Sequence, residues 1–322
     1  TNLKKMILFK KIRDFLTVRN YRKKKDRFIG NINDIRELLL NHHQYLSKVN
    51  SKNSLNLYGG KIFSQTDEDG ITIEIIKRLN CLNNGNFIEF GVGDGTENNT
   101  LILKALGWKG FWVGNQELII DYKNSKNFSY LKNFVNLSNI IYLIQDGLSK
   151  INETRVDVIS LDLDGNDYYF LEKIIENKIR PKLFIIEYNA KFPPPIKWKI
   201  AYNDNHKWKG DDYFGASLST YNDFLESRGY KLICCNAYTG ANAFFIKKEY
   251  ADLFKEVPDK IEDIYKFSDR EIEATHDFIQ IVFPLAEPSF WSSNKYFIES
   301  QQQIDSLSKN KNVKEAILHL EN

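Results

Sequence analysis

Residues 86–100 have the sequence Asn86-Phe-Ile-Glu-Phe-Gly-Val-Gly-Asp-Gly-Thr-Glu-Asn-Asn-Thr100 and are the most informative segment about the architecture of the chain. An apolar run at its start is followed by three glycines at alternate positions, and a second apolar segment begins at Leu101. This order predicts a buried strand, a tight turn and a helix. Glycine suits the turn because a backbone without Cβ can adopt positive φ angles and approach a ligand closely. We therefore expect a small-molecule site at the end of this strand.

The spacing of the glycines separates two classes of ligand. Gly91, Gly93 and Gly95 follow the pattern G-x-G-x-G, and Glu89 stands two residues before the first of them. A dinucleotide-binding turn has the spacing G-x-G-x-x-G instead. The observed pattern resembles the first motif of the class I methyltransferases, which bind S-adenosylmethionine. That resemblance implies that Glu89 helps to hold the methionine ammonium group and that the glycines leave room for the amino-acid end. A tight connection without any ligand is the alternative that this motif alone leaves open.

The composition predicts an ordinary folded protein. The chain of 322 residues is 42% hydrophobic and 14% aromatic, and no run reaches the roughly 18 apolar residues of a membrane span. No signal-peptide pattern is recognised, so we expect a cytoplasmic location. The three cysteines lack the spacing of metal ligands and are expected to be packing residues.

Positive charge is concentrated at the start of the chain. Residues 1–27 contain eleven basic and two acidic residues, a net +9, so the total of +3 leaves −6 for the remainder. An acidic body argues against a nucleic-acid partner, which requires positive charge around the binding groove. Leu8, Ile12, Phe15 and Leu16 share one face of a predicted basic helix. Contact of this helix with the inner face of an anionic membrane, docking against protein and a homo-oligomer are all compatible with the sequence.

The rest of the chain alternates predicted strands and helices. A helix is predicted at residues 34–46, and the acidic segment 64–70 leads into a capped helix that begins near Ile71. Further strands are predicted at residues 108–113, 139–144, 156–163 and 183–186. Strands separated by helical segments indicate a doubly wound α/β fold with a parallel sheet, whose ligand lies at the carboxyl ends of the strands.

Several motifs in a fixed order resemble the FkbM-like branch of the class I methyltransferases. They are Ser64-Gln-Thr-Asp-Glu-Asp-Gly70, the glycine stretch with Glu97-Asn-Asn-Thr100, Gly107-Trp-Lys-Gly110, Ser160-Leu-Asp-Leu-Asp-Gly-Asn-Asp-Tyr168, Glu187-Tyr-Asn189, and Gly229-Tyr230 with Asn242-Ala-Phe-Phe245. The resemblance implies a Rossmann-like sheet of order 3-2-1-4-5-7-6, closed by residues 230–235 and 243–247 as an antiparallel pair. It divides the chain into a basic helical extension (1–54), a methyltransferase domain (55–250) and a helical C-terminal region (251–322). The implied activity is O-methylation of a sugar, nucleotide sugar or surface-glycan precursor.

The resemblance also assigns contacts with S-adenosylmethionine. Besides Glu89 and the glycines it implies Gln65, Asp162 and Asp146, the last near the adenine because it follows the predicted third strand. Family members bind both ribose hydroxyls with an acid after strand two, but here Gly114-Asn115-Gln116-Glu117 occupies this position. Asn115 or Glu117 is the expected substitute.

The densest polar cluster follows two predicted strands that are expected to be neighbours. Asp162 and Asp164 share one face of an extended chain, and Glu187 and Asn189 have the same spacing. Such oxygen ligands suit Mg²⁺, Ca²⁺ or Mn²⁺. Cation-dependent O-methyltransferases use two aspartates and an asparagine in a similar place, where the metal binds the acceptor hydroxyl and lowers its pKa. The alternative is that the carboxylates bind the cofactor and a helix N-terminus without a metal.

The predicted loop at residues 191–215 combines aromatic with polar side chains, which suits a carbohydrate acceptor. His206 in this loop is a candidate general base beside Asp162 and Asp164, and a surface histidine is the alternative. A stretch within residues 261–289 resembles the core of the opioid-growth-factor-receptor-like domain and is expected to shape the acceptor pocket or to mediate assembly. Two other functions stay open: methylation of a phosphate- or phosphoramidate-type group on a glycan, and a non-catalytic cofactor-binding or scaffold protein.

Overall fold

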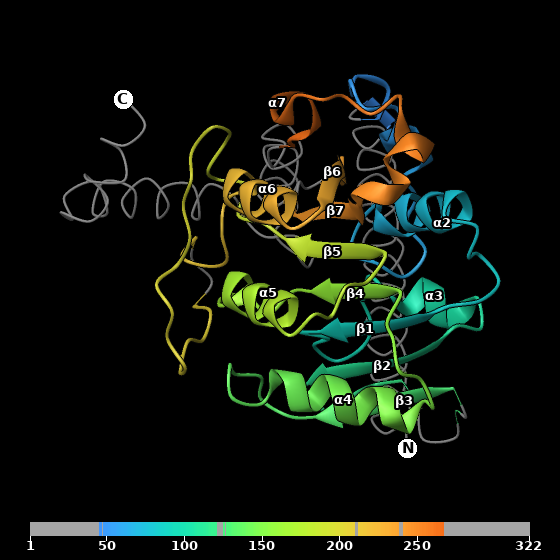
Figure 1. Ribbon diagram of the computed structural model, residues 1–322, viewed down its shortest axis with the longest axis vertical. Coiled ribbons are helices and arrows are strands. Elements are labelled where there is room, and N and C mark those ends of the chain that lie inside the picture. Colours follow the sequence, from blue (N-terminus) through green and yellow to red (C-terminus); the bar gives the residue numbers. More distant parts are fainter. Residues whose placement is uncertain are drawn as a thin grey trace, which may run out of the picture. The chain divides into compact units, whose positions relative to one another are not determined.

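The computed structural model describes residues 45–46, 48–120, 125, 127–209, 212–237 and 241–266. Within them a seven-stranded sheet has the order β3-β2-β1-β4-β5-β7-β6 (Figure 1). Its strands are β1 Asn86–Phe90, β2 Lys109–Gly114, β3 Phe128–Lys132, β4 Val158–Leu161, β5 Leu183–Glu187, β6 Tyr230–Cys235 and β7 Asn242–Lys247. The predicted Rossmann-like α/β fold and its strand order are confirmed.

Strand pairing decides which residues meet at the carboxyl edge of the sheet. In the parallel part, Phe90 lies opposite Val113 of β2 and Leu161 of β4. Leu161 in turn pairs with Ile186 of β5. Strand β7 is inserted antiparallel between β5 and β6 and places Asn242 opposite Glu187. The segments that follow β1, β2, β4 and β5 therefore emerge at one edge.

Helices cover both faces of the sheet. They are α2 Glu68–Arg78, α3 Leu101–Ala105, α4 Ile140–Lys150, α5 Asp167–Glu176, α6 Leu218–Ser227 and α7 Ile261–Ile264, with the 3-10 helices η1 Ser54–Tyr58 and η2 Lys248–Phe254. Figure 1 shows α4, α5 and α6 in a row along one face. The connection from β1 to β2 runs across the sheet in the opposite direction from that between β3 and β4. Because both crossovers are right-handed, α3 covers the other face.

The central strands are buried on both faces, which explains why their sequences are almost continuously apolar. All five residues of β1 and all four of β4 are buried. Glycines permit the closest contacts in this core: a Cβ on Gly110 would lie 2.3 Å from the Phe87 ring, and one on Gly147 would lie 2.3 Å from Phe111. The charged side chain of Glu89 is buried in β1 as well.

The prediction of a third strand at residues 139–144 is wrong, because these residues belong mostly to α4. The buried residues of α4 recur at helical spacing, namely Ile140, Leu143, Ile144, Gly147 and Leu148. The third strand is β3, at the edge of the sheet, where half-buried Ser129 and exposed Lys132 weaken the apolar signal. Asp146, which was predicted to follow the strand, consequently lies within α4.

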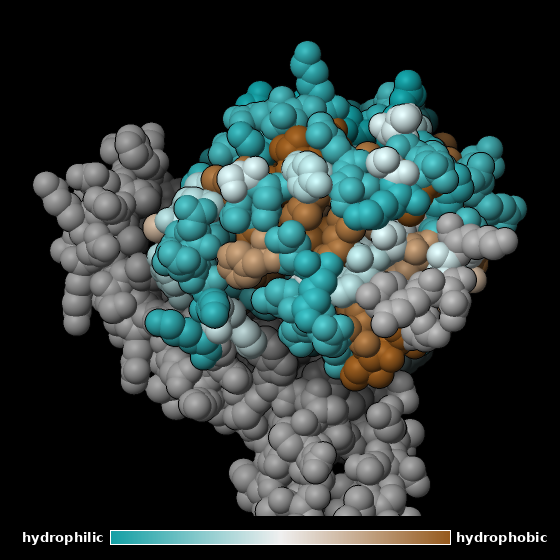
Figure 2. Space-filling model, turned by 90° about the horizontal axis from the view of Figure 1, so that it is seen from below, coloured by the Kyte–Doolittle hydropathy of each residue, from teal (hydrophilic) through white to brown (hydrophobic). Residues whose placement is uncertain are grey.

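Several predicted segments lie outside the described residues: the basic N-terminal helix, most of the helix at 34–46, and the chain beyond residue 266. None of the described helices has the length and apolar character needed to cross a membrane. Figure 2 views the molecule from the side of β3 and α4 and shows hydrophobic areas among hydrophilic ones. Exposed hydrophobic side chains of β3, α4 and the segments next to them are Ile119, Phe134 and Tyr142.

Candidate active site

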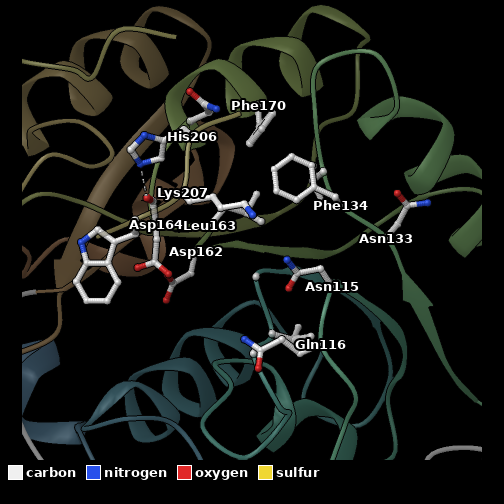
Figure 3. Close-up of a pocket in the computed structure, with 17 residues that line it drawn as sticks. Asn115, Gln116, Asn133, Phe134, Asp162, Leu163, Asp164, Phe170, His206 and Lys207 are labelled. Atoms are coloured by element: carbon white, nitrogen blue, oxygen red, sulfur yellow. Dashed lines mark hydrogen bonds between the residues drawn. The ribbon is translucent and has the colours of Figure 1, made fainter. Parts of the chain in front are cut away.

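A cavity of about 350 Å³ opens at the carboxyl edge of the sheet (Figure 3). Its size lies in the range of small-molecule sites, roughly 300–1,000 Å³. Five segments of chain line it: Gly91, Val92 and Gly93 after β1; Gly114, Asn115 and Gln116 at the end of β2; Asn133, Phe134 and Val135 after β3; Asp162, Leu163, Asp164, Asn166 and Phe170 after β4; and His206, Lys207 and Trp208 from the loop. The pocket thus lies where the fold predicts a ligand.

The glycine turn contributes Gly91 and Gly93 to the pocket wall. Both have positive φ, 87° and 53°, as has Gly95 at 89°, which is not among the lining residues. A Cβ on Gly91 would lie 1.5 Å from the backbone oxygen of Asp162, so only glycine fits between the ends of β1 and β4. A Cβ on Gly93 would meet no atom within 4 Å. Gly91 therefore serves the packing of the strands, whereas Gly93 keeps the pocket wall open.

Glu89 is not among the lining residues, and its carboxylate binds the start of α3. Its oxygens accept hydrogen bonds from the backbone N–H groups of Asn99 and Thr100, at 2.9 and 3.1 Å, and from the Thr100 hydroxyl at 2.5 Å. The Thr100 hydroxyl accepts from the Trp112 indole at 2.8 Å. Burial raises the pKa of Glu89 to about 7, although these hydrogen bonds lower it. Glu89 thus holds the chain between the glycine turn and α3 in place. Its contact with a methionine ammonium group stays a prediction.

Two amides stand where the ribose-binding acid was expected. Asn115 and Gln116 both line the pocket and are labelled in Figure 3. Glu117 is 81% exposed and forms an ion pair with Lys132. Of the two substitutes that the sequence left open, Asn115 is the one in the pocket, and Gln116 was not predicted.

Two further residues predicted to contact the cofactor do not line the pocket. Asp146 forms an ion pair with Lys150 one turn along α4. Gln65 is half-buried ahead of α2 and is also absent from the lining. The residues that follow the observed third strand, Asn133 and Phe134, line the pocket instead. They were missed because strand three was misplaced.

Acidic residues in the first turn of α2 hold the segment ahead of this helix and connect it to β7. Asp69 Oδ2 accepts from the backbone N–H groups of residues 62, 63 and 64 at 2.7, 2.6 and 2.8 Å. Glu68 accepts from the Asn242 amide at 3.2 Å, and Asn242 accepts from the Asn99 amide at 3.2 Å. Burial, followed by the charge of Asp67, raises the pKa of Glu68. These hydrogen bonds connect α2 with β7 and with Asn99, which follows the glycine turn.

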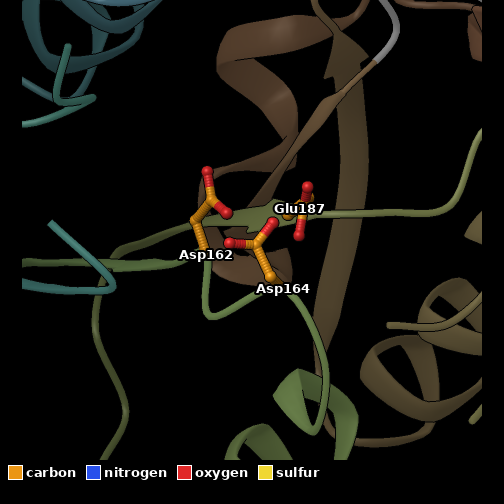
Figure 4. Close-up of side chains that lie close together, drawn as sticks. All are labelled: Asp162, Asp164 and Glu187. Carbon is orange, nitrogen blue, oxygen red and sulfur yellow. The ribbon is translucent and has the colours of Figure 1, made fainter. Parts of the chain in front are cut away.

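Three carboxylates meet at the ends of β4 and β5 (Figure 4). Asp162, Asp164 and Glu187 each offer an oxygen that lies within 4.8 Å of the other two. Burial is the largest cause, and neighbouring carboxylates the next, of a pKa well above the usual range for Asp162 and Glu187. The same two causes raise the pKa of Asp164 to about 6. The structure therefore brings together three of the four residues predicted as metal ligands.

The turn after β4 holds Asp164 in an uncommon backbone conformation. Asp164 has a φ of 53°, in the left-handed region that aspartate tolerates better than most residues. The Asp167 carboxylate accepts from the backbone N–H groups of Leu163 at 2.8 Å and Gly165 at 3.0 Å. His206 Nε2 also donates a hydrogen bond to the Asp164 carbonyl oxygen, at 3.1 Å. Backbone strain held in place in this way is typical of functional sites.

His206 lies against this turn. A Cβ on Gly165 would lie 2.3 Å from His206 Cδ2, so the imidazole ring packs directly on the glycine. Because a carbonyl oxygen can only accept, Nε2 carries the proton in the hydrogen bond to Asp164 that Figure 3 shows, and Nδ1 is the acceptor of the neutral ring. In this arrangement His206 positions Asp164, and a role as general base stays a prediction.

Asn189 anchors the loop that carries His206. Its amide nitrogen donates to the backbone oxygens of Asp212 at 2.7 Å and Phe214 at 3.1 Å. Its side-chain oxygen accepts from the Lys191 N–H at 3.1 Å. The side chain of Asn189 is therefore engaged with the loop, and its role as a metal ligand stays a prediction.

Some aromatic side chains of the loop at residues 191–215 pack against one another. Phe192 stacks on Trp198 with ring centroids 4.4 Å apart, and Tyr213 meets Trp198 edge to face at 5.8 Å. Trp208, by contrast, lines the pocket beside Lys207. Trp208 is therefore the tryptophan of this loop that is placed to contact a ligand.

Comparisons with known proteins show likeness to several solved structures. No family model and no curated protein matches the sequence, so the FkbM-like and opioid-growth-factor-receptor-like resemblances stay predictions. One matching structure is the fibrillarin/Nop5p complex, at 13% identity and a TM-score of 0.31, with 51% of this chain and 71% of that chain covered. A second is described as a ribosomal RNA methyltransferase from Plasmodium falciparum (11%, TM-score 0.32, coverage 58% and 97%). A third is described as a hemolysin from Lactococcus lactis (10%, TM-score 0.35, coverage 58% and 90%). Likenesses this distant carry no information on activity.

Proposed function

We propose that this chain is an S-adenosylmethionine-dependent methyltransferase. The observation that supports the proposal is a pocket at the carboxyl edge of a 3-2-1-4-5-7-6 sheet, with a G-x-G-x-G turn in its wall. The residues fit the cofactor, because Gly93 leaves open the space that a side chain would fill, and amides and an apolar ring line the wall beyond it. When bound, S-adenosylmethionine supplies an electrophilic methyl group on a sulfonium.

The position of each lining residue supports a role for it. Gly91 and Gly93 leave room for the methionine end. Asn115 and Gln116 line the pocket, and their amides would both donate and accept hydrogen bonds with the two ribose hydroxyls. Phe134 offers an aromatic face to the adenine ring.

We infer that the acceptor is a hydroxyl group of a sugar, a nucleotide sugar or a surface-glycan precursor. The same pocket joins Asp162 and Asp164 to Asn166 and Trp208. A sugar ring stacks on an aromatic face while its hydroxyls bond to carboxylates and amides. The two carboxylates then orient the acceptor oxygen toward the methyl group, and such alignment is a major part of catalysis for a displacement between two bound reactants.

Calorimetric titration with S-adenosylhomocysteine tests the cofactor site. We expect saturable binding to one site per chain, with a Kd on the order of 1–100 μM. A Kd of about 1 μM corresponds to a binding free energy of about 8 kcal/mol. Absence of binding at millimolar ligand would refute every cofactor-dependent function. A screen of nucleotide sugars with labelled S-adenosylmethionine, with and without Mg²⁺, then identifies the acceptor.

Two observations favour second candidates. Lys207 lines the pocket beside the acceptor side and would pair with an anion, which favours methylation of a phosphate- or phosphoramidate-type group on a glycan. The amide at Asn115, in place of an acid, favours a non-catalytic cofactor-binding protein. The mass and NMR spectrum of the product distinguish the first candidate from a methyl ether. Binding of S-adenosylhomocysteine without transfer to any acceptor would support the second.

A further inference from the structure

The carboxylates of Asp162, Asp164 and Glu187 face one another without a countercharge. One oxygen of each lies within 4.8 Å of the others. Across the part of the chain that the structure describes, none of the three forms an ion pair with a basic side chain. Like charges this close repel in a half-buried site, so a shared proton or a bound cation is required.

The side chains of Asp162 and Glu187 are close enough to share a proton, but two buried polar atoms at the cluster favour a bound cation. Glu187 Oε2 and the Tyr221 hydroxyl have no hydrogen-bond partner among the described residues. Tyr221 comes from α6 and is fully buried. A Cβ on Gly215 would lie 3.9 Å from the Tyr221 hydroxyl, and the Gly215 N–H donates to the Gly165 carbonyl oxygen at 2.9 Å, so the hydroxyl lies close to the turn that carries Asp164. Buried polar atoms are rarely left unpaired. A hydrated cation would satisfy both, as a direct ligand of Glu187 and through a bound water at Tyr221.

The three ligands are held in place by separate parts of the fold. Glu187 is the last residue of β5, and Asp162 follows β4, so the sheet fixes both. The strained turn at Asp164 is held by hydrogen bonds between its backbone and the side chains of Asp167 and His206. Asp162 and Asp164 also line the open pocket, so that water or a hydroxyl group can reach a cation between them. Carboxylate oxygens with open positions are the donors that Mg²⁺ and Mn²⁺ prefer.

We propose that Asp162, Asp164 and Glu187 bind one divalent cation of the Mg²⁺ or Mn²⁺ type at the wall of the pocket. The acceptor hydroxyl then completes the coordination of the cation, and this part of the inference rests on the proposed methyltransferase function. Binding of the cation itself rests only on the ligand geometry. His206 and Asp167 act as positioning residues for Asp164.

Titration of the metal-stripped full chain with Mn²⁺, followed by the loss of the free-ion EPR signal, tests the cation site. We expect one bound Mn²⁺ per chain in the wild type and at least about tenfold weaker binding in Glu187→Gln, because site affinity follows the number of charged ligands. Glu176→Gln is the matched control, since Glu176 is exposed at the end of α5. It should bind Mn²⁺ as the wild type does.

Asp164→Asn provides a second variant in case Glu187→Gln does not fold. Asparagine tolerates the positive φ of this position, and the turn keeps its bonds to Asp167 and His206. It should also weaken Mn²⁺ binding about tenfold or more. No Mn²⁺ binding by the wild type, or equal binding by the wild type and both site variants, would overturn the proposal and leave a shared proton as the explanation.

Parallel calorimetry with S-adenosylhomocysteine in excess EDTA separates the two proposals. If this ligand binds and Mn²⁺ does not, the cation site is refuted while the cofactor site stands. If Mn²⁺ binds and S-adenosylhomocysteine does not, the cation site stands while the methyltransferase function fails.

Discussion

Gly93 and Gly107 form a matched pair that separates ligand binding from backbone conformation. Both have positive φ, 53° and 86°, and a Cβ on either would meet no atom within 4 Å. Substitution of either glycine by alanine should therefore lower the free energy of unfolding by about 1–2 kcal/mol, because a residue with Cβ disfavours the left-handed conformation. Gly93 lines the pocket and Gly107 does not.

We accordingly expect Gly93→Ala to weaken S-adenosylhomocysteine binding about tenfold or more, which corresponds to about 1.4 kcal/mol. Gly107→Ala should bind as the wild type does. Calorimetry measures both affinities, and urea unfolding checks that the two variants lose similar stability. Equal loss of affinity in the two variants would show that the effect is conformational and that Gly93 does not face the ligand.

Residue roles could be read from the sequence where the chemistry is local. Asp162 and Asp164 stand two apart after an apolar strand, and Glu187 ends the next one, so their meeting followed from the strand order. Glu89 illustrates the limit. An acid before a glycine turn points to a ligand, but the structure turns its carboxylate to the N–H groups of Asn99 and Thr100. Such a choice between two nearby donors is decided by side-chain geometry.

Among the elements, the assignment of β3 and α4 decides which residues after the third strand line the pocket. The more apolar segment, residues 139–144, predicts a strand, whereas the sheet uses the shorter, more polar segment 128–132 at its edge. Edge strands need less burial, so their apolar signal is weak. The alternation of buried Phe128 and Tyr130 with half-buried Ser129 was the available signal.

Phe134 follows β3, and substitutions there and on α4 test the corrected assignment. We expect Phe134→Ala to weaken S-adenosylhomocysteine binding about tenfold, because stacking on a base contributes about 1–3 kcal/mol. Tyr142→Ala removes an aromatic side chain that is 65% exposed on α4 and should leave binding unchanged. Asp146→Asn should leave it unchanged as well. Isothermal titration calorimetry measures the affinity of the three variants for S-adenosylhomocysteine. A loss of affinity in Asp146→Asn with none in Phe134→Ala would support the contact first predicted for Asp146.

For the whole molecule, Glu89 makes stability depend on pH. Its pKa of about 7 in the folded chain exceeds the ordinary 4.5. The folded state therefore binds more protons between these pH values, and the free energy of unfolding falls as pH rises from about 4.5 to about 7. The contribution is on the order of 3 kcal/mol across this window.

Urea unfolding of the wild type and of Glu89→Gln at about pH 5 and about pH 7.5 measures this contribution. We expect the variant to lose less stability than the wild type between the two pH values. Glu68 and the three carboxylates of the cluster also have raised pKa values and are present in both proteins, so the difference reports Glu89 together with its coupling to Asp162, whose pKa the charge of Glu89 raises. The same pH dependence in both proteins would contradict the assignment of this pKa to Glu89.

The resemblance to the class I methyltransferases implied the order of the strands, and the sequence alone predicted the fold class and the segment that forms the glycine turn. The sequence could do so because apolar strands, glycine at positive φ and helix periodicity are local properties of the chain. Which polar residues face the pocket depends instead on how distant segments pack together. Gly91 must be glycine because the backbone of Asp162 lies against it, and Gly165 must be small because His206 packs on it. These contacts join residues 41 to 71 positions apart in sequence, and the packing of strands and loops against one another sets them.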